Sequence, residues 1–160
     1  MNADRIRMAV PNDASRIASV LSEAFAEYQS FYTPEAFAAT TPTSDQILSR
    51  LDEGPARVAV LNDAIVGTVS AVHKGEALYI RGMAILPAAR GQGIGELLIG
   101  QVESFASAHD YRRLLLSTTP FLTRAIRLYE HLGFRCSDEG PHDLFGTPLL
   151  SMVKTLAGTL

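Results

Sequence analysis

The segment 78–106 constrains the fold most, because an apolar, strand-like run passes through a glycine-rich loop directly into an amphipathic stretch. After the loop, apolar residues recur at helical spacing, which predicts that a helix begins near Gly93. The first N–H groups of such a helix have no partner within it, and the helix dipole adds partial positive charge. Gly91, Gly93 and Gly95 carry no Cβ atom that would keep a ligand away. The loop therefore predicts a cradle for a pyrophosphate group.

The spacing of this loop excludes two common phosphate-binding motifs. A P-loop needs a lysine after its last glycine, and Glu96 stands there instead. A dinucleotide fingerprint needs G-x-G-x-x-G, whereas this chain has G-x-G-x-G from Gly91 to Gly95. The pattern that remains is R-x-x-G-x-G, from Arg90 to Gly95, and it resembles the acyl-coenzyme A loop of the GNAT family, the Gcn5-related N-acetyltransferases. A glycine-rich connection that binds no ligand is the alternative interpretation.

A second motif carries the same resemblance. It reads A-x-x-L-Y-x-x-x-G-F from Ala125 to Phe134, and its alanine, leucine and tyrosine share one face of a predicted helix. Gly133 is expected to end that helix in the left-handed conformation. Many relatives have an asparagine three residues before the alanine, and its side-chain amide hydrogen-bonds the pantetheine arm. This chain has Leu122 at that position, so that hydrogen bond must be lost or replaced. Thr123 is a candidate substitute.

The expected fold is an α/β mixed sheet with helices on both faces, in the order β-α-α-β-β-β-α-β-α-β-β. The GNAT resemblance implies that the strands at 78–86 and 113–117 are parallel neighbours that splay apart at one end, where the pantetheine arm enters. Gly82 predicts either a bulge in the first of these strands or a tight packing contact under a helix. Residues 28–42 are expected to be irregular or only partly helical.

The resemblance also implies a co-substrate, acetyl-coenzyme A, and direct transfer of its acetyl group to an amine without a covalent enzyme intermediate. Tyr129 matches the family tyrosine that protonates or hydrogen-bonds the coenzyme A sulfur, although a buried structural tyrosine is the alternative. A backbone N–H, of Ala84 or Ile85, is expected to stabilise the oxyanion. The residues expected to hold the co-substrate are Met83, Ala84, Ile85, Arg90, Gly91, Gln92, Gly93, Ile94, Gly95, Leu122, Ala125 and Tyr129.

The attacking amine must lose a proton, and the sequence offers candidates rather than one assignment. Glu76 stands at the entrance of the cofactor strand, where it is either a base or a solvated hairpin residue. Tyr79 could organise a proton-carrying water. By family analogy, the acceptor side is expected to be lined by Glu27, Tyr28, Tyr32 and His142.

Composition predicts one domain over residues 1–160 and narrows the partners. Of the residues, 47% are hydrophobic, which suits one core, and no apolar run reaches the length of a membrane span. The start of the chain is mixed polar and predicts no signal peptide. Cys136 is the only cysteine, so we expect no disulfide, no metal and a cytoplasmic location. A net charge of −3 argues against nucleic acid as a binding partner.

The predicted function is therefore acetyl transfer to a small-molecule or peptide amine of unknown identity. A catalytically silent acyl-coenzyme A-binding module is the alternative from another class, and a hydroxyl or thiol acceptor is a third. A homodimer is left open as the oligomeric state.

Overall fold

The computed structural model describes residues 5–156. The elements of the first half are β1 (Ile6–Met8), α1 (Ala14–Phe25), α2 (Pro34–Thr40), α3 (Ser44–Arg50), β2 (Ala56–Leu61), β3 (Ala64–Lys74) and β4 (Ala77–Ile85). Those of the second half are α4 (Ile94–Ala108), β5 (Arg113–Thr118), α5 (Thr123–His131), β6 (Arg135–Ser137), β7 (Asp143–Leu144), β8 (Thr147–Pro148) and β9 (Leu150–Thr155). Short 3-10 turns lie at Pro11–Asp13, Ala26–Phe31 and Pro87–Ala89. The ends of the predicted domain, residues 1–4 and 157–160, and with them the start of the chain used in the signal-peptide argument, lie outside the described residues.

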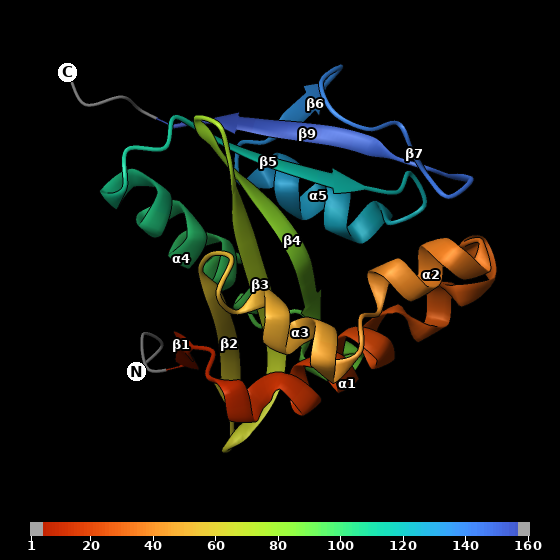
Figure 1. Cartoon of the computed structure of the whole chain (residues 1–160), viewed down its shortest axis with the longest axis vertical. Helices are drawn as coiled ribbons and strands as arrows, with labels where there is room; N and C mark the ends of the chain where they lie inside the picture. Colours follow the sequence, from red (N-terminus) through yellow and green to blue (C-terminus); the bar gives the residue numbers. More distant parts are fainter. Residues whose placement is uncertain (1–4, 157–160) are drawn as a thin grey trace.

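Seven strands form one sheet in the order β1-β2-β3-β4-β5-β9-β6, and β7 and β8 form a separate small hairpin (Figure 1). Within this sheet β4 and β5 run parallel, while the other neighbouring pairs are antiparallel. The predicted mixed sheet and the order of its elements are confirmed, with two additions, the helix α2 and the β7–β8 hairpin. Within the described residues, no helix is both long and apolar enough to cross a membrane.

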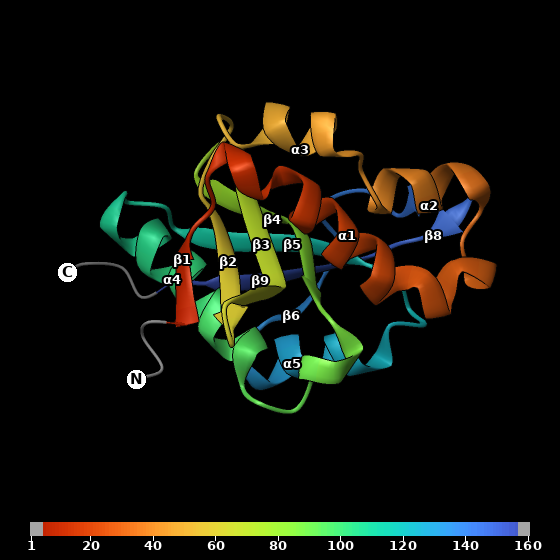
Figure 2. The same ribbon diagram turned by 90° about the horizontal axis from the view of Figure 1, so that it is seen from below.

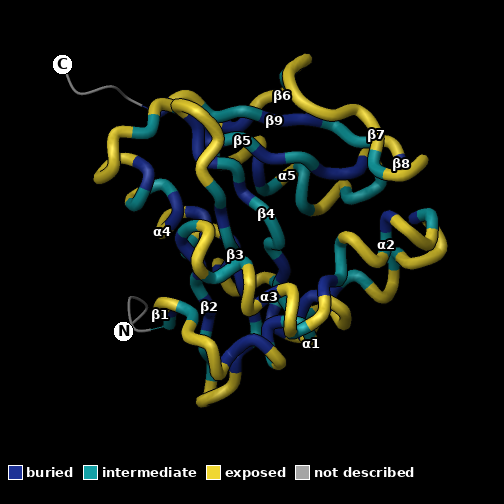
Figure 3. The backbone as a smooth tube through the Cα atoms, in the orientation of Figure 1, coloured by how far each residue is buried: buried dark blue, intermediate teal, exposed yellow. Residues whose placement is uncertain are grey.

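Helices cover both faces of the sheet, as predicted: α1 and α3 lie on one side and α4 and α5 on the other (Figure 2). Each side has its own buried cluster. On the first side, Val20 and Leu21 of α1 pack with Ile47 of α3. On the second, Leu98 and Val102 of α4 join apolar residues of the central strands. The buried backbone accordingly runs through the centre of the sheet and the inner faces of the helices (Figure 3).

Local signals explain where several elements begin. Asn62 and Asp63 have φ angles of 51° and 64°, which makes a tight left-handed turn between β2 and β3. A capping box begins α3, where the Thr43 N–H donates to Gln46 Oε1 at 2.9 Å. The segment expected to be only partly helical contains α2, whose first turn is capped by the Thr33 hydroxyl.

The central parallel pair opens into a split. β4 and β5 are paired from Ala77 opposite Arg113 to Ile80 opposite Leu116, and the ladder ends there. Immediately afterwards β4 contains a bulge, one of the two features that Gly82 was expected to mark: Ser70 of β3 pairs with Arg81 and Thr68 pairs with Ala84, so two residues of β4 oppose one of β3. Gly82 adopts φ +73°, a conformation that suits glycine. The bulge bends β4 away from β5 at the point where the split begins.

Candidate active site

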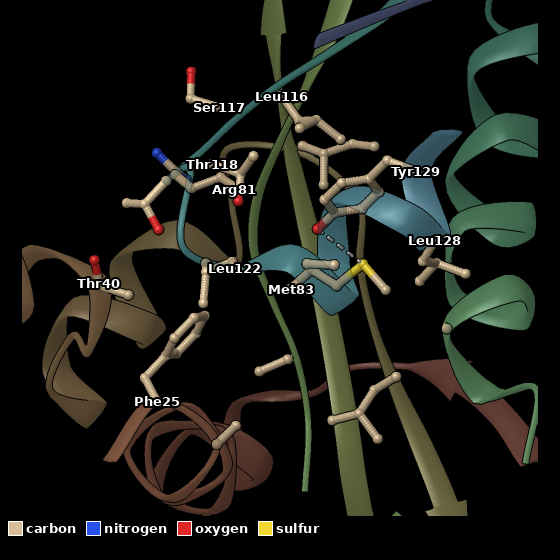
Figure 4. Close-up of a pocket in the computed structure, with 18 of the residues that line it drawn as sticks. Phe25, Thr40, Arg81, Met83, Leu116, Ser117, Thr118, Leu122, Leu128 and Tyr129 are labelled. Atoms are coloured by element: carbon tan, nitrogen blue, oxygen red, sulfur yellow. Dashed lines mark hydrogen bonds between the residues drawn. The ribbon is translucent and has the colours of Figure 1, made fainter. Parts of the chain in front are cut away.

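A cavity of about 790 Å³ occupies the split between β4 and β5 and extends to the loops on either side. Figure 4 shows Tyr129 and Met83 turned toward each other beside this space, with Phe25 and Leu122 approaching from other elements. The predicted site residues that line the cavity are Tyr28, Tyr32, Tyr79, Met83, Ala84, Ile85, Arg90, Gly91, Gly93, Ile94, Gly95, Leu122, Ala125 and Tyr129. Four others are not part of its lining: Glu27, Glu76, Gln92 and His142.

The glycine loop lies at one end of the cavity, and its glycines are needed for different reasons. Gly91 and Gly93 have φ angles of +81° and +77°, and a Cβ atom added to either would meet nothing within 4 Å. The space over the loop is therefore open to a ligand. Gly95 differs, because its added Cβ would lie 2.7 Å from Leu128 Cδ2. That glycine allows α4 to pack closely against α5, a reason that the sequence argument for a ligand approach had missed.

The start of α4 leaves its first N–H groups available. Gly93 is the N-cap residue, and no side chain caps the helix there. Arg90, just before it, forms an ion pair with Glu27 at 2.8 Å and approaches the carbonyl of Ala24 at 3.4 Å. These contacts fasten the loop to the end of α1. Glu27 thus contacts the loop rather than the interior of the cavity.

Tyr129 is buried, with 8% of its surface exposed, and its hydroxyl group donates to Met83 Sδ at 3.8 Å. Burial, together with the proximity of Tyr32, raises the pKa of Tyr129 to about 12. The phenol is therefore neutral at physiological pH and can donate a hydrogen bond. A thioether is a weak acceptor, so little is lost when a better acceptor takes its place.

The backbone of β4 beyond the split has a free edge toward the cavity. The Leu86 N–H donates to Val66 of β3 at 2.8 Å. Since neighbouring residues of a strand turn their backbone groups to opposite edges, the N–H of Ile85 faces away from β3 and toward the split. Of the two backbone donors considered from sequence, Ala84 and Ile85, this alternation favours Ile85.

The acceptor end of the cavity is aromatic on one wall. Tyr28 and Tyr32, on the segment after α1, have ring centroids 6.1 and 5.0 Å from that of Phe121. Burial raises the pKa of Tyr32. Beside them, Ser117 Oγ and Thr119 Oγ1 are buried without a hydrogen-bond partner among the described residues. Unpaired buried hydroxyl groups are costly, so these two are candidates to bind a ligand.

The structure places some of the candidate proton acceptors in the cavity and others outside it. Glu76 lies in the β3–β4 hairpin, at the opposite end of β4 from the split, where its carbonyl accepts the Arg112 N–H. Tyr79 lines the cavity, and Lys74 Nζ lies 5.1 Å from its ring centre. His142 is exposed outside the cavity, whereas its neighbour Asp143 lines it. Asp143 Oδ2 accepts the Gly146 N–H at 3.0 Å, so this carboxylate is also engaged in the β7–β8 turn.

Three cationic residues of the cavity wall, Arg50, Arg81 and Arg124, are not among the predicted site residues. Alternation along β4 puts Arg81 on the same face as Tyr79, and that is a usable signal. Nothing comparable marks Arg50, because it is the last residue of a short helix. Within the described residues, no group of three or more His, Cys, Asp or Glu side chains is arranged to hold a metal ion.

Known proteins resemble this chain in sequence over part of its length. N-acetylaspartate synthetase of Rattus norvegicus is 35% identical over 101 residues, which are 62% of this chain and 34% of that protein. The uncharacterized N-acetyltransferase YjgM of Escherichia coli (strain K12) is 45% identical over 56 residues, 35% of this chain and 34% of that one. The matched segments thus span about a third of the length of these relatives.

Solved structures share the fold over nearly the whole chain. The PaiA N-acetyltransferase of Thermoplasma acidophilum in complex with coenzyme A superposes with a TM-score of 0.81 at 14% identity, covering 94% of this chain and 98% of that one. YncA of Salmonella typhimurium with acetyl-CoA gives 0.76 at 20% identity, covering 97% and 95%. The Acetyltransferase (GNAT) family model matches residues 17–134. The glycine loop and the split sheet agree with this match. The chain therefore belongs to the GNAT acetyltransferase family.

Proposed function

We propose that this protein transfers the acetyl group of acetyl-coenzyme A to an amine by direct attack. The observation that carries this proposal is the cavity at the β4–β5 split, which joins an open helix N-terminus at Gly93 to the buried hydroxyl of Tyr129. A phosphate-binding end and a proton-donating group in one continuous space are the two requirements of such a transfer.

The residues of the cavity suit coenzyme A. The N-terminal N–H groups of α4 and the open space above Gly91 and Gly93 suit a pyrophosphate. The free edge of β4 at Ile85 suits an amide-containing arm, because that edge has no strand partner past Ile80. Leu122 offers only apolar contact at the position where relatives have an amide, and the unpaired hydroxyl of Thr119 is nearby in the chain.

Acetyl-coenzyme A supplies an activated thioester, and the chain's own groups act around it. The Ile85 N–H stabilises negative charge on the carbonyl oxygen as the amine forms its new C–N bond. As the C–S bond breaks, Tyr129 donates to the leaving sulfur. A phenol with a pKa of about 12 favours a strong hydrogen bond over complete proton transfer to a thiolate. The proton of the amine leaves through water, with Asp143 or Tyr79 as the cavity groups that can order it.

The acceptor is tested by a screen of amines with acetyl-coenzyme A, in which release of free thiol is measured. The panel includes aspartate because some relatives are named N-acetylaspartate synthetase. Thiol release that requires one amine, with the acetylated amine identified by mass spectrometry, supports the proposal. Binding of acetyl-coenzyme A without thiol release from any amine, hydroxyl or thiol would instead favour a silent binding module.

A further inference from the structure

Two arginine side chains line the cavity wall beside the Gly82 bulge. Arg50 is the last residue of α3, and Arg81 directly precedes the bulge in β4. The Nη1 atom of Arg50 lies 4.0 Å from the position of a Cβ built on Gly82. The Arg50 guanidinium group therefore lies next to the bulge. Burial lowers the pKa of Arg50, and the nearby positive charge of Arg81 lowers it further.

The charges of this wall are only partly balanced. Arg81 forms an ion pair with Glu53 at 2.7 Å. Arg50 makes no ion pair with any residue between 5 and 156, although Glu53 is near enough to act on its charge. Two guanidinium groups and one carboxylate leave one net positive charge at the wall. In addition, the Nε of Arg81 is buried and has no hydrogen-bond partner among the described residues. Arg50 thus retains its guanidinium donors for a ligand, and Arg81 has Nη1 donors besides the Nη2 that bonds Glu53.

The chemistry of a complementary ligand follows from these donors. A guanidinium group binds carboxylate or phosphate through paired N–H donors. One net positive charge matches a singly charged carboxylate better than a doubly charged phosphate. It also disfavours a polyamine, whose charges would be repelled. The wall adjoins the bulge, and the bulge adjoins the free edge of β4 where we place the thioester. The wall and the free edge at Ile85 line the same cavity, so a carboxylate bound at the wall shares that space with the attacking amine.

We propose that the acceptor is an amino acid or a similar amine with a nearby carboxylate, and that Arg50 and Arg81 bind this carboxylate. The proposal rests on the proposed acetyl transfer and adds the substrate class. Arg50 and Arg81 are binding residues in this assignment, because they contact the acceptor and not the thioester.

The test compares each proteinogenic amino acid with its own methyl ester and includes spermidine, with thiol release as the measurement. We expect a free amino acid to be acetylated with a lower KM than its ester. Arg50→Gln should raise that KM by about tenfold or more, equivalent to about 1.4 kcal/mol, while KM for the ester changes little. Arg50→Lys should recover part of the loss. Arg135→Gln, an exposed site on β6 with the same change of charge, is the control.

The outcomes separate this proposal from the proposed function. Esters or spermidine acetylated with KM values equal to or below those of the amino acids would overturn it, as would an unchanged KM in Arg50→Gln. If no amine releases thiol, acetyl transfer fails, and the carboxylate site is then judged by thermal shift of the coenzyme A-loaded protein with the same amino acids. A shift that Arg50→Gln abolishes would support the site; no shift with any amino acid would refute it.

Discussion

At the scale of single residues, Tyr129 combines burial with a weak partner. Its hydroxyl group is held 3.8 Å from a methionine sulfur, whereas buried hydroxyl groups usually bond oxygen or nitrogen. The Tyr129 hydroxyl group is thus shielded from water and makes only a weak hydrogen bond. The hydroxyl can therefore exchange Met83 for a ligand sulfur at little cost in free energy. The ring stays fixed because it packs on Phe134, with 5.8 Å between the ring centroids.

Replacing Tyr129 by Phe removes the donor and keeps the ring. We expect kcat to fall by roughly 10²–10³ because the leaving sulfur loses its hydrogen bond, with little change in coenzyme A affinity. Steady-state kinetics with the identified acceptor and calorimetry with coenzyme A measure the two quantities. An unchanged kcat in a folded variant would mean that Tyr129 is structural and that water protonates the thiolate.

The raised pKa of Tyr129 also predicts a pH dependence of stability. Tyr129 ionises near its ordinary pKa of 10 in the unfolded chain but near 12 in the folded one, so the folded state is favoured below pH 10 and loses this advantage as pH rises toward 12. The loss amounts to about 3 kcal/mol. Urea unfolding at pH 9, 10 and 11 should show a steeper decline for the native protein than for Tyr129→Phe. Parallel declines would contradict the shifted pKa.

At the scale of elements, the cofactor half was predictable because it is nearly contiguous. A strand, a glycine loop and a helix follow one another from Ala77 to Ala108, and local spacing specifies all three. The bulge at Gly82 was one of two interpretations that sequence left open, since a strand glycine marks either a bend or a close contact. The role of Gly95 was missed because it depends on Leu128 of another helix, 2.7 Å from the added Cβ.

Pyrophosphate binding at the N-terminus of α4 can be tested by substituting two glycines, one in the loop and one on the exposed face of the helix. Gly93→Val places a branched side chain at φ +77° in the loop, so we expect coenzyme A affinity to fall by about tenfold or more. Gly100→Ala lies on the exposed face of the same helix, with nothing within 4 Å of the added Cβ. It should stabilise the protein by about 0.5–1 kcal/mol and leave the affinity unchanged. Calorimetry and urea unfolding measure both; full affinity in a folded Gly93→Val would contradict the cradle.

At the scale of the whole molecule, the acceptor half could not be predicted because its parts are far apart in sequence. The segment before α2 meets the β7–β8 hairpin (Figure 2), where Thr33 N–H donates to Thr147 Oγ1 at 3.0 Å. Their neighbours Tyr32 and Leu144 line the cavity. The Thr33 hydroxyl in turn donates to the Phe145 carbonyl at 2.8 Å. No local pattern pairs residues at this separation. For the same reason, no local pattern predicts the approach of Arg50, at the end of α3, to Gly82.

This link between Thr33 and Thr147 supplies the last prediction. Thr147 is 2% exposed, so Thr147→Val keeps the shape of its side chain while leaving the Thr33 N–H without its acceptor. We expect a loss of about 1–3 kcal/mol in the free energy of unfolding, measured in urea. Because the link closes the acceptor side, KM for the acceptor should rise while coenzyme A affinity, governed by the distant glycine loop, stays constant. Thr155→Val, at an exposed position of β9, is the matched control and should change neither. If Thr147→Val weakened coenzyme A binding as much as acceptor binding, the two halves of the cavity would not be independent, and the division of the site proposed above would be wrong.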